Sequence, residues 1–173
     1  MTGEPLARTL APWSAGAVAG GIAGVLFAVV MGPAEFIPMV GALYGLEESL
    51  VGGWIFHLLH SLVFGVVLVA LARVVGGLGR LIEDSPLGAL LGAGYGIVVW
   101  LIFASFVMPA WMGGVTGMSP PVPDWNALSF IGHIVYGATL SGLYPLLTKG
   151  EALSEIDLRE ASSSDRRREA VRS

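Results

Sequence analysis

The sequence predicts an all-α integral membrane protein with four transmembrane helices, arranged as a tandem repeat of two helical hairpins. Three observations lead to this prediction: a composition poor in charge, four long apolar segments, and matching patterns of small residues in the two halves. Hydrophobic residues make up 54% of the 173 residues and charged residues 13%, about half of the roughly 25% typical of soluble domains. Such a composition favours a surface facing lipid, and the length fits one domain.

Four apolar segments are long enough to cross a bilayer, whose hydrocarbon core of roughly 30 Å requires about 20 helical residues. They cover residues 15–40, 52–75, 87–110 and 127–147. A cleavable signal peptide is the alternative for the first segment, but its apolar run is longer than the roughly 7–15 residues of a signal h-region. We therefore expect a transmembrane domain over residues 15–148, a short cytoplasmic segment before it (1–14) and a disordered cytoplasmic tail after it (149–173).

The positions of the basic residues predict the orientation, because Lys and Arg are retained in the cytoplasm. All nine lie before the first segment, between the second and third, or after the fourth: Arg8, Arg73 and Arg80, and six from Lys149 onward. The other two connections contain none. Both termini are therefore expected on the cytoplasmic side of the cell membrane. Aromatic residues that favour the outer interface agree with this orientation: Tyr44, Trp54, Trp111 and Trp125.

The two halves of the chain carry the same pattern of small residues and histidines. A shift of 72 positions places Gly16, Gly20 and Gly24 on Gly88, Gly92 and Gly96. A shift of 76 positions places His57, Ser61 and Gly65 on His133, Gly137 and Ser141. Each half has two spans, so both halves would insert in the same direction, as in transporters built from parallel repeats.

Glycine triplets at four-residue spacing predict close helix packing, because lipid tails are as apolar as Leu and helices associate through close backbone approach. We expect the first and third spans, which carry these triplets, to form a closely packed central pair. The rival interpretation is that the same faces join copies of the chain in a homo-oligomer.

Four ionisable side chains fall inside the predicted spans: Glu35, His57, His60 and His133. Glu35 follows Gly24 by eleven residues, which returns it to within about 20° of the glycine face of a continuous helix. The histidines lie near the outer ends of their spans. All four are expected to point into the bundle and to share one layer, around a polar cavity that faces outward. Glu35 has Val107 as its counterpart in the second half, so such a site would be asymmetric.

Three interpretations of this layer stay open. The histidines bond to neighbouring helices and only fix their packing, or they form a site for protonation or permeation, since imidazole titrates near neutral pH. The third is a bound transition metal, with Zn²⁺ favoured by imidazole and carboxylate ligands. The function predicted is transport or permeation of a small solute, ion or proton. The alternative is a membrane scaffold or sensor that does not transport.

Other classes of function find no support in the sequence. It has no His-Glu-x-x-His motif, no Gly-x-Ser-x-Gly elbow and no P-loop, so we expect no enzymatic activity. The chain has no Cys, which removes thiolate chemistry and Cys-based metal sites. A net charge of −4 argues against nucleic acid as a partner. The expected partners are the lipid bilayer and, in the oligomeric interpretation, a second copy of the chain.

The second half also carries a local resemblance to a known family. The segment from Met108-Pro109 through Ser119-Pro120-Pro121-Val122-Pro123-Asp124-Trp125, followed by Ile131-Gly132-His133, resembles the YagU-like inner-membrane family. Members of that family have a comparable Gly-x-x-Pro-Pro-Val loop before a Gly-His helix. More broadly, the chain is similar to small duplicated four-helix prokaryotic membrane proteins of unknown function. The resemblance implies no reaction, and it draws attention to His133 and the outer loop.

Overall fold

The described part of the chain is a bundle of helices. A computed structural model describes residues 10–46 and 49–149, and no strand occurs within those two ranges. The elements are α1 (Pro12–Met31), α2 (Pro33–Ala42), α3 (Leu50–Val74), α4 (Leu78–Ile82), α5 (Ser85–Val99), the π-helix η1 (Trp100–Val107), α6 (Met108–Thr116) and α7 (Ala127–Thr148). Most of the predicted terminal segments, 1–14 and 149–173, lies outside the described residues.

Four of the helical stretches are long and apolar enough to cross a membrane, which confirms that part of the predicted fold class. They are Pro12–Met31, Leu50–Val74, Pro86–Thr116 and Ala127–Thr148. The third stretch runs without a break through α5, η1 and α6, so it is longer than the predicted 87–110. Side chains before three of the helices cap their first turns, because Ser49, Asp84 and Asn126 each accept a backbone N–H from the helix that follows.

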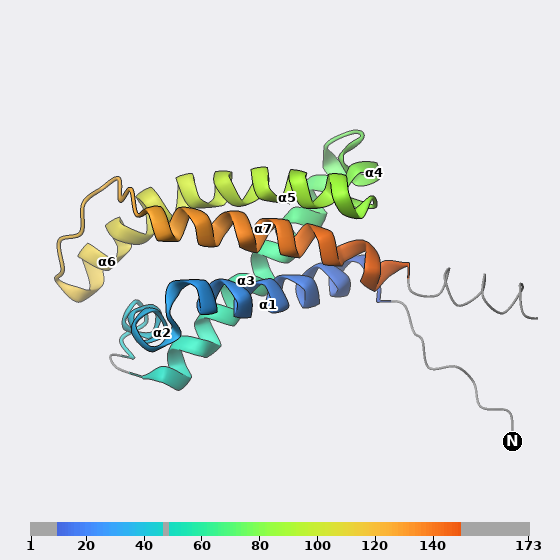
Figure 1. Cartoon of the computed structure of the whole chain (residues 1–173). Helices are drawn as coiled ribbons and strands as arrows, with labels where there is room; N and C mark the ends of the chain where they lie inside the picture. Colours follow the sequence, from blue (N-terminus) through green and yellow to red (C-terminus); the bar gives the residue numbers. More distant parts are fainter. Residues whose placement is uncertain (1–9, 47–48, 150–173) are drawn as a thin grey trace, which may run out of the picture.

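The first predicted span, 15–40, is two helices rather than one. Gly32 separates α1 from α2 and has φ 82°, a left-handed conformation that glycine adopts at little cost. Pro33 follows, and a proline disfavours the α conformation of the residue before it. Figure 1 shows the consequence: α1 runs along the bundle, whereas α2 turns across its end.

The third stretch widens into a π-helix just before Pro109. Proline has no N–H, so Pro109 cannot bond to the carbonyl four residues earlier, that of Ser105. That carbonyl instead accepts the backbone N–H of Asp124 at 2.8 Å. The free carbonyl of Ser105 in η1 therefore holds the connection between α6 and α7 against this helix.

The glycine triplets form close contacts, but with partners other than those predicted. A Cβ placed on Gly20 would collide with the backbone oxygen of Ser61 on α3, and one on Gly92 with that of Gly137 on α7. The packed pairs are thus α1 with α3 and α5 with α7, and the halves meet where α1 packs against α7. The prediction that the first and third spans form the central pair is wrong, because α1 and α5 are not packed together. Figure 1 shows α5 and α7 side by side.

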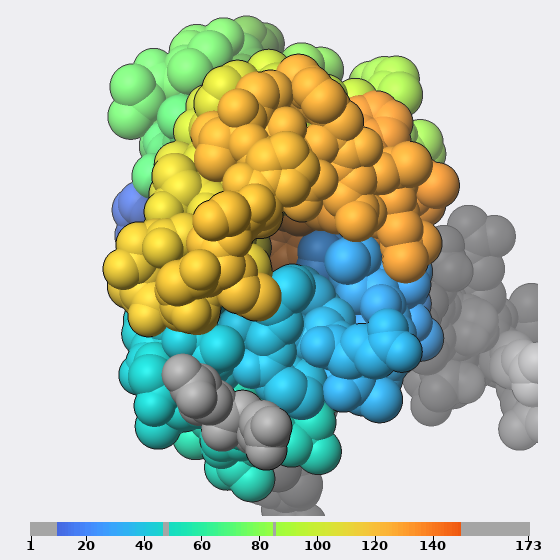
Figure 2. Space-filling view, turned by 90° about the vertical axis from the view of Figure 1, so that its left-hand side faces the viewer, coloured from blue at the N-terminus to red at the C-terminus, as the bar shows by residue number. Residues whose placement is uncertain are grey.

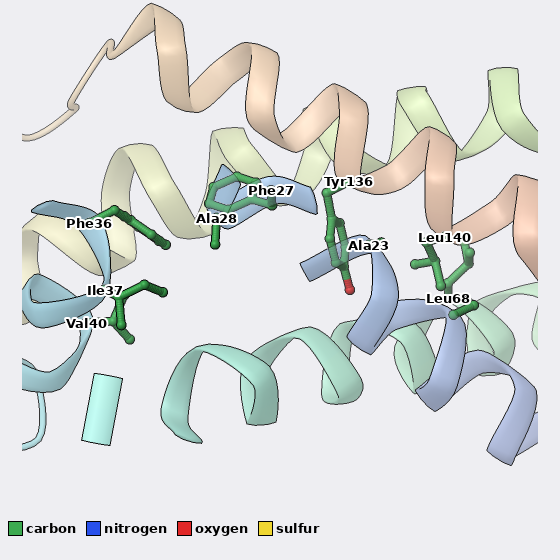
Figure 3. Packing of buried hydrophobic residues seen from close by; sticks show 10 residues of the cluster. Ala23, Phe27, Ala28, Phe36, Ile37, Val40, Leu68, Tyr136 and Leu140 are labelled. Atoms are coloured by element: carbon green, nitrogen blue, oxygen red, sulfur yellow. The ribbon is translucent and has the colours of Figure 1, made fainter. Parts of the chain in front are cut away.

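The apolar core lies where the two hairpins meet. Figure 3 shows residues from α1, α2, α3 and α7 pointing into this space, with Phe27 and Tyr136 near its middle. The Tyr136 hydroxyl donates a hydrogen bond to the backbone oxygen of Ser61 at 2.7 Å. Tyr95 on α5 likewise donates to the oxygen of Phe64 on α3 at 2.8 Å. These two bonds join the second hairpin to the first.

Candidate functional site

A cavity of about 750 Å³ opens at the end of the bundle formed by α2, α6 and residues 117–126, which we call the cavity end. Figure 2 looks onto this end and shows the hollow between the blue, cyan, yellow and orange parts of the chain. Its walls come from α1, α2, α3, the stretch from Val99 to Met112, the following connection and α7. Both hairpins therefore contribute to one site.

His57, on α3, lies at the inner part of this cavity and crosses the seam between α1 and α3. Its side chain is 6% exposed, and its Nε2–H donates to the backbone oxygen of Gly24 at 2.8 Å. Because Nε2 carries the proton, Nδ1 of the neutral ring is a hydrogen-bond acceptor. Gly24 has no side chain at this point, and a Cβ there would collide with Ser61.

His133, on α7, has the opposite tautomer. Its Nδ1–H donates to the backbone oxygen of Ser129, one turn earlier in the same helix, at 2.7 Å. In the neutral ring Nε2 is therefore the acceptor, and His133 lines the cavity. The two histidines occupy matching positions in the sequence, but one bonds across a helix seam and the other within its own helix.

His60 takes part in a separate aromatic cluster at the cavity end. The Tyr44 hydroxyl is hydrogen-bonded to Nε2 of His60, and the Tyr44 ring stacks on Phe56 and meets Trp111 edge-on at 5.1 Å. Burial raises the pKa of Tyr44, so its hydroxyl stays protonated and donates this bond. Trp111 belongs to the second hairpin, so the cluster joins the two hairpins beside the cavity.

The four predicted ionisable residues do not form a metal site. The ring of Phe27 packs against both inner histidines, with its centroid 5.8 Å from that of His57 and 4.8 Å from that of His133. Within residues 10–46 and 49–149, no group of three His, Cys, Asp or Glu side chains is placed to hold a metal ion. The arrangement expected for Zn²⁺, with His57, His60, His133 and Glu35 as ligands, is therefore corrected.

Glu35 is the residue that departs most from the prediction. It is exposed on α2 and does not line the cavity. The predicted direction assumed one straight helix through residue 35, but the chain turns at Gly32, so the angular relation to Gly24 is lost. The sequence contained a signal for this turn, because a glycine followed by a proline is a common helix end.

The cavity wall is mainly aromatic rings and methionines, which corrects the prediction of a polar cavity. Six rings other than histidine line it: Phe27, Phe36, Phe64, Phe103, Trp111 and Tyr136. All five methionines of the described residues line it as well: Met31, Met39, Met108, Met112 and Met118. Methionine is flexible and polarizable, and is frequent on surfaces that accept ligands of varied shape. Sequence reasoning missed this group because its members come from two distant parts of the chain.

Asp124 is a further lining residue whose role the sequence did not reveal. It is half-buried and is the one acidic residue of the cavity wall, where no Lys or Arg occurs among the described residues. Its backbone is fixed by the bond to the Ser105 carbonyl. Position in a proline-rich connection alone could not show that the carboxylate lies beside a cavity.

Two departures from regular α-helix shape the opening, namely the turn at Gly32 and the π-helix η1. The turn at Gly32 brings Phe36 and Met39 of α2 to the wall, and η1 supplies Phe103 and Ala104 on another side. Short π-helical turns are frequent at functional sites.

The chain matches no protein-family model, no curated protein and no solved structure. The resemblance to the YagU-like family therefore stays a prediction.

Proposed function

We propose that the chain is a multi-pass protein of the cell membrane, with both termini in the cytoplasm. Four helices have the length and apolar character to span a bilayer. Many large apolar side chains face outward, for example Val51 and Leu90, each 72% exposed, where lipid would cover them. Arg73, Arg80 and Lys149 all lie at the end opposite the cavity, so the positive-inside rule puts the cavity on the outer side.

We also infer that the two hairpins are copies of one ancestral hairpin. In the first, Gly20 packs against Ser61 and Gly65. In the second, Gly92 packs against Gly137 and Ser141, which are the positions reached by the 76-residue shift. Contacts that match in this way support a duplication more strongly than shared glycine spacing alone.

We propose that the protein binds a small, mostly apolar molecule in the cavity, which the molecule enters from the outer side. One observation supports this above others: a cavity of about 750 Å³ is walled by rings and thioethers, with a few polar groups among them. Small-molecule sites have typical volumes of roughly 300–1,000 Å³ and this kind of lining. The seam contacts of Gly16, Gly20, Gly88 and Gly92 lie beyond the inner histidines, and we infer that they close the site toward the cytoplasm.

The experiment that tests this proposal is saturable binding of triphenylmethanol to the purified full chain in lipid nanodiscs. Ala104→Phe places a ring in the cavity and takes up space that the ligand would occupy. It should weaken binding about tenfold, which corresponds to roughly 1.4 kcal/mol of binding free energy. Leu90→Phe adds a ring on the exposed face of α5 and should change nothing. An absence of saturable binding in the unmodified chain, or equal binding by the Ala104→Phe variant, would refute the proposal.

Permeation of protons or ions is the second candidate, and the three imidazoles beside the cavity are the observation that favours it. Permeation lacks the carboxylate that the sequence predicted for a relay, because Glu35 does not line the cavity. If it operates, replacing His57 and His133 together with Phe should abolish proton-linked flux in proteoliposomes. Flux that is unchanged, or absent from the unmodified chain, argues against it.

A further inference from the structure

We propose that the ligand of this cavity is a lipophilic organic cation: an apolar, preferably aromatic body that carries a single positive charge. This inference rests on the proposed binding function and names the class of ligand. Three features of the wall support it, namely its charge, its hydrogen-bonding groups and its ring faces.

The charge at the cavity end is negative in the described residues. Asp124 lines the cavity, Glu35 is exposed on α2 nearby, and residues 9–72 and 81–148 contain no Lys or Arg at all. Two of the three cationic side chains of the described residues are engaged at the other end: Arg73 lies over the ring of Trp13 at 4.5 Å, and Lys149 donates to the oxygen of Glu83 at 2.8 Å. Among the described residues, the carboxylate of Asp124 thus has no cationic side chain as a neighbour at its own end.

The inner histidines present hydrogen-bond acceptors rather than donors. His57 uses its Nε2–H on Gly24, and His133 uses its Nδ1–H on Ser129, which leaves one lone pair on each neutral ring. Such a wall suits a ligand that donates hydrogen bonds or carries positive charge. It disfavours an anion, because no Lys or Arg of the described residues is present to neutralise one.

The rings and thioethers add a second attraction for positive charge. The faces of Trp, Tyr and Phe attract cations, by roughly 0.5–2 kcal/mol for each favourable contact. Trp111 and Phe103 come from the second hairpin and Phe27 and Phe36 from the first, so a ligand in the cavity has rings on more than one side. Methionine sulfur is polarizable and adapts to varied shapes. The same wall therefore accommodates both the apolar body and the charge.

Three probes of similar shape and different charge test the proposal: tetraphenylphosphonium (+1), triphenylmethanol (0) and tetraphenylborate (−1). Their binding is measured to the full chain in nanodiscs of zwitterionic lipid. We expect tetraphenylphosphonium to bind about tenfold more tightly than triphenylmethanol, a difference of about 1.4 kcal/mol, and tetraphenylborate not to compete. Asp124→Asn should weaken phosphonium binding about tenfold and leave triphenylmethanol binding unchanged.

Glu35→Gln is the matched control, because it removes an acid at the same end but outside the cavity, and it should change neither affinity by more than about twofold. Thermal unfolding of both variants at the temperature of the unmodified chain verifies that they are folded. If triphenylmethanol binds but the phosphonium binds no better, or if Asp124→Asn weakens both equally, the cation proposal fails and the binding function stands. If none of the probes saturates, both fail. Stoichiometric binding of Ag⁺ without phosphonium binding would replace the organic cation with a soft metal ion at the thioethers.

Discussion

The two ends of the bundle are built on opposite principles. We call one end the seam end; it is formed by Gly16, Gly20, Gly88 and Gly92 with their partners. The helices lie so close there that a methyl group on Gly20 or Gly92 would collide with backbone. At the cavity end close contacts persist within each hairpin, as between Gly53 and Ile37 and between Gly96 and His133, but a hollow is left between the two hairpins. There α1 ends at Gly32, the third stretch widens before Pro109, and about 750 Å³ is left unfilled.

This contrast indicates that regular and irregular helix geometry have separate roles in this molecule. Small residues at four-residue spacing keep two helices straight and close, which is how membrane helices gain stability. A glycine or proline that interrupts the helix moves side chains away from the axis and creates room. Stability is therefore expected to depend on the seam end, and binding on the cavity end. The following substitutions test that division.

The largest effect is expected at the seam end. Gly92→Ala should lower the free energy of unfolding by about 1–3 kcal/mol, because the added methyl meets the backbone of Gly137, which cannot move without shifting α7. Gly94→Ala is the matched control on the same helix, since nothing lies within 4 Å of its Cβ position. It should stabilise the helix by up to about 1 kcal/mol. Equal unfolding temperatures for the two variants in detergent would contradict the seam.

A smaller difference should separate the two histidines. His57→Phe removes a buried hydrogen bond between α3 and α1, and should cost about 1–3 kcal/mol. His133→Phe removes a bond within α7 and should cost less than about 1 kcal/mol, because the Ser129 carbonyl keeps its helical environment. Unfolding of both variants in the same detergent measures the difference. If His133→Phe is the more damaging, the two histidines play roles opposite to those assigned by their hydrogen bonds.

The sequence predicted the helical spans well because their signal is local. Each apolar run is long enough to be recognised as a candidate span without information from the rest of the chain, so the number of candidate spans can be counted directly. The sequence predicted close packing at the glycines but not which helices pack together. A small residue allows a close approach, but it does not determine which helix approaches. Gly16 and Gly88 share a spacing, yet they pack on α3 and α7 rather than on each other's helices.

The candidate site was less predictable, because the direction of its side chains depends on irregular turns in the backbone. Glu35 does not lie in the predicted layer, because the chain turns at Gly32. Met39 and Met112 are 73 positions apart in the sequence but line the same cavity. The turn at Gly32 positions Met39, and Met112 follows the π-helix. The histidines lie in the part of their helices that faces the cavity, but their hydrogen-bond partners could not be read from spacing.

A modest effect on local order is expected from Pro109→Ala. Alanine restores an N–H that can bond to the Ser105 carbonyl, in competition with the N–H of Asp124. We expect faster hydrogen exchange of the Asp124 amide, by up to about tenfold, with overall stability nearly unchanged. Pro86→Ala, in the first turn of α5 at the opposite end, should leave that amide unaffected. Unaltered exchange in Pro109→Ala would show that the connection is fixed by other contacts.

The smallest effect should come from the hydroxyl of Tyr44, and its size relative to that of Tyr136 completes the comparison of the two ends. Tyr136→Phe removes a buried bond between α7 and α3, so it should cost about 1 kcal/mol. Tyr44→Phe removes the bond to His60 but keeps the stacking on Phe56 and the contact with Trp111. Because this cluster is only partly buried, water can replace the lost partner, and the cost should be below about 0.5 kcal/mol. A larger loss for Tyr44→Phe than for Tyr136→Phe, measured by unfolding in detergent, would mean that the cavity end contributes to stability through polar bonds. The glycine seams would then not be the main support of the bundle.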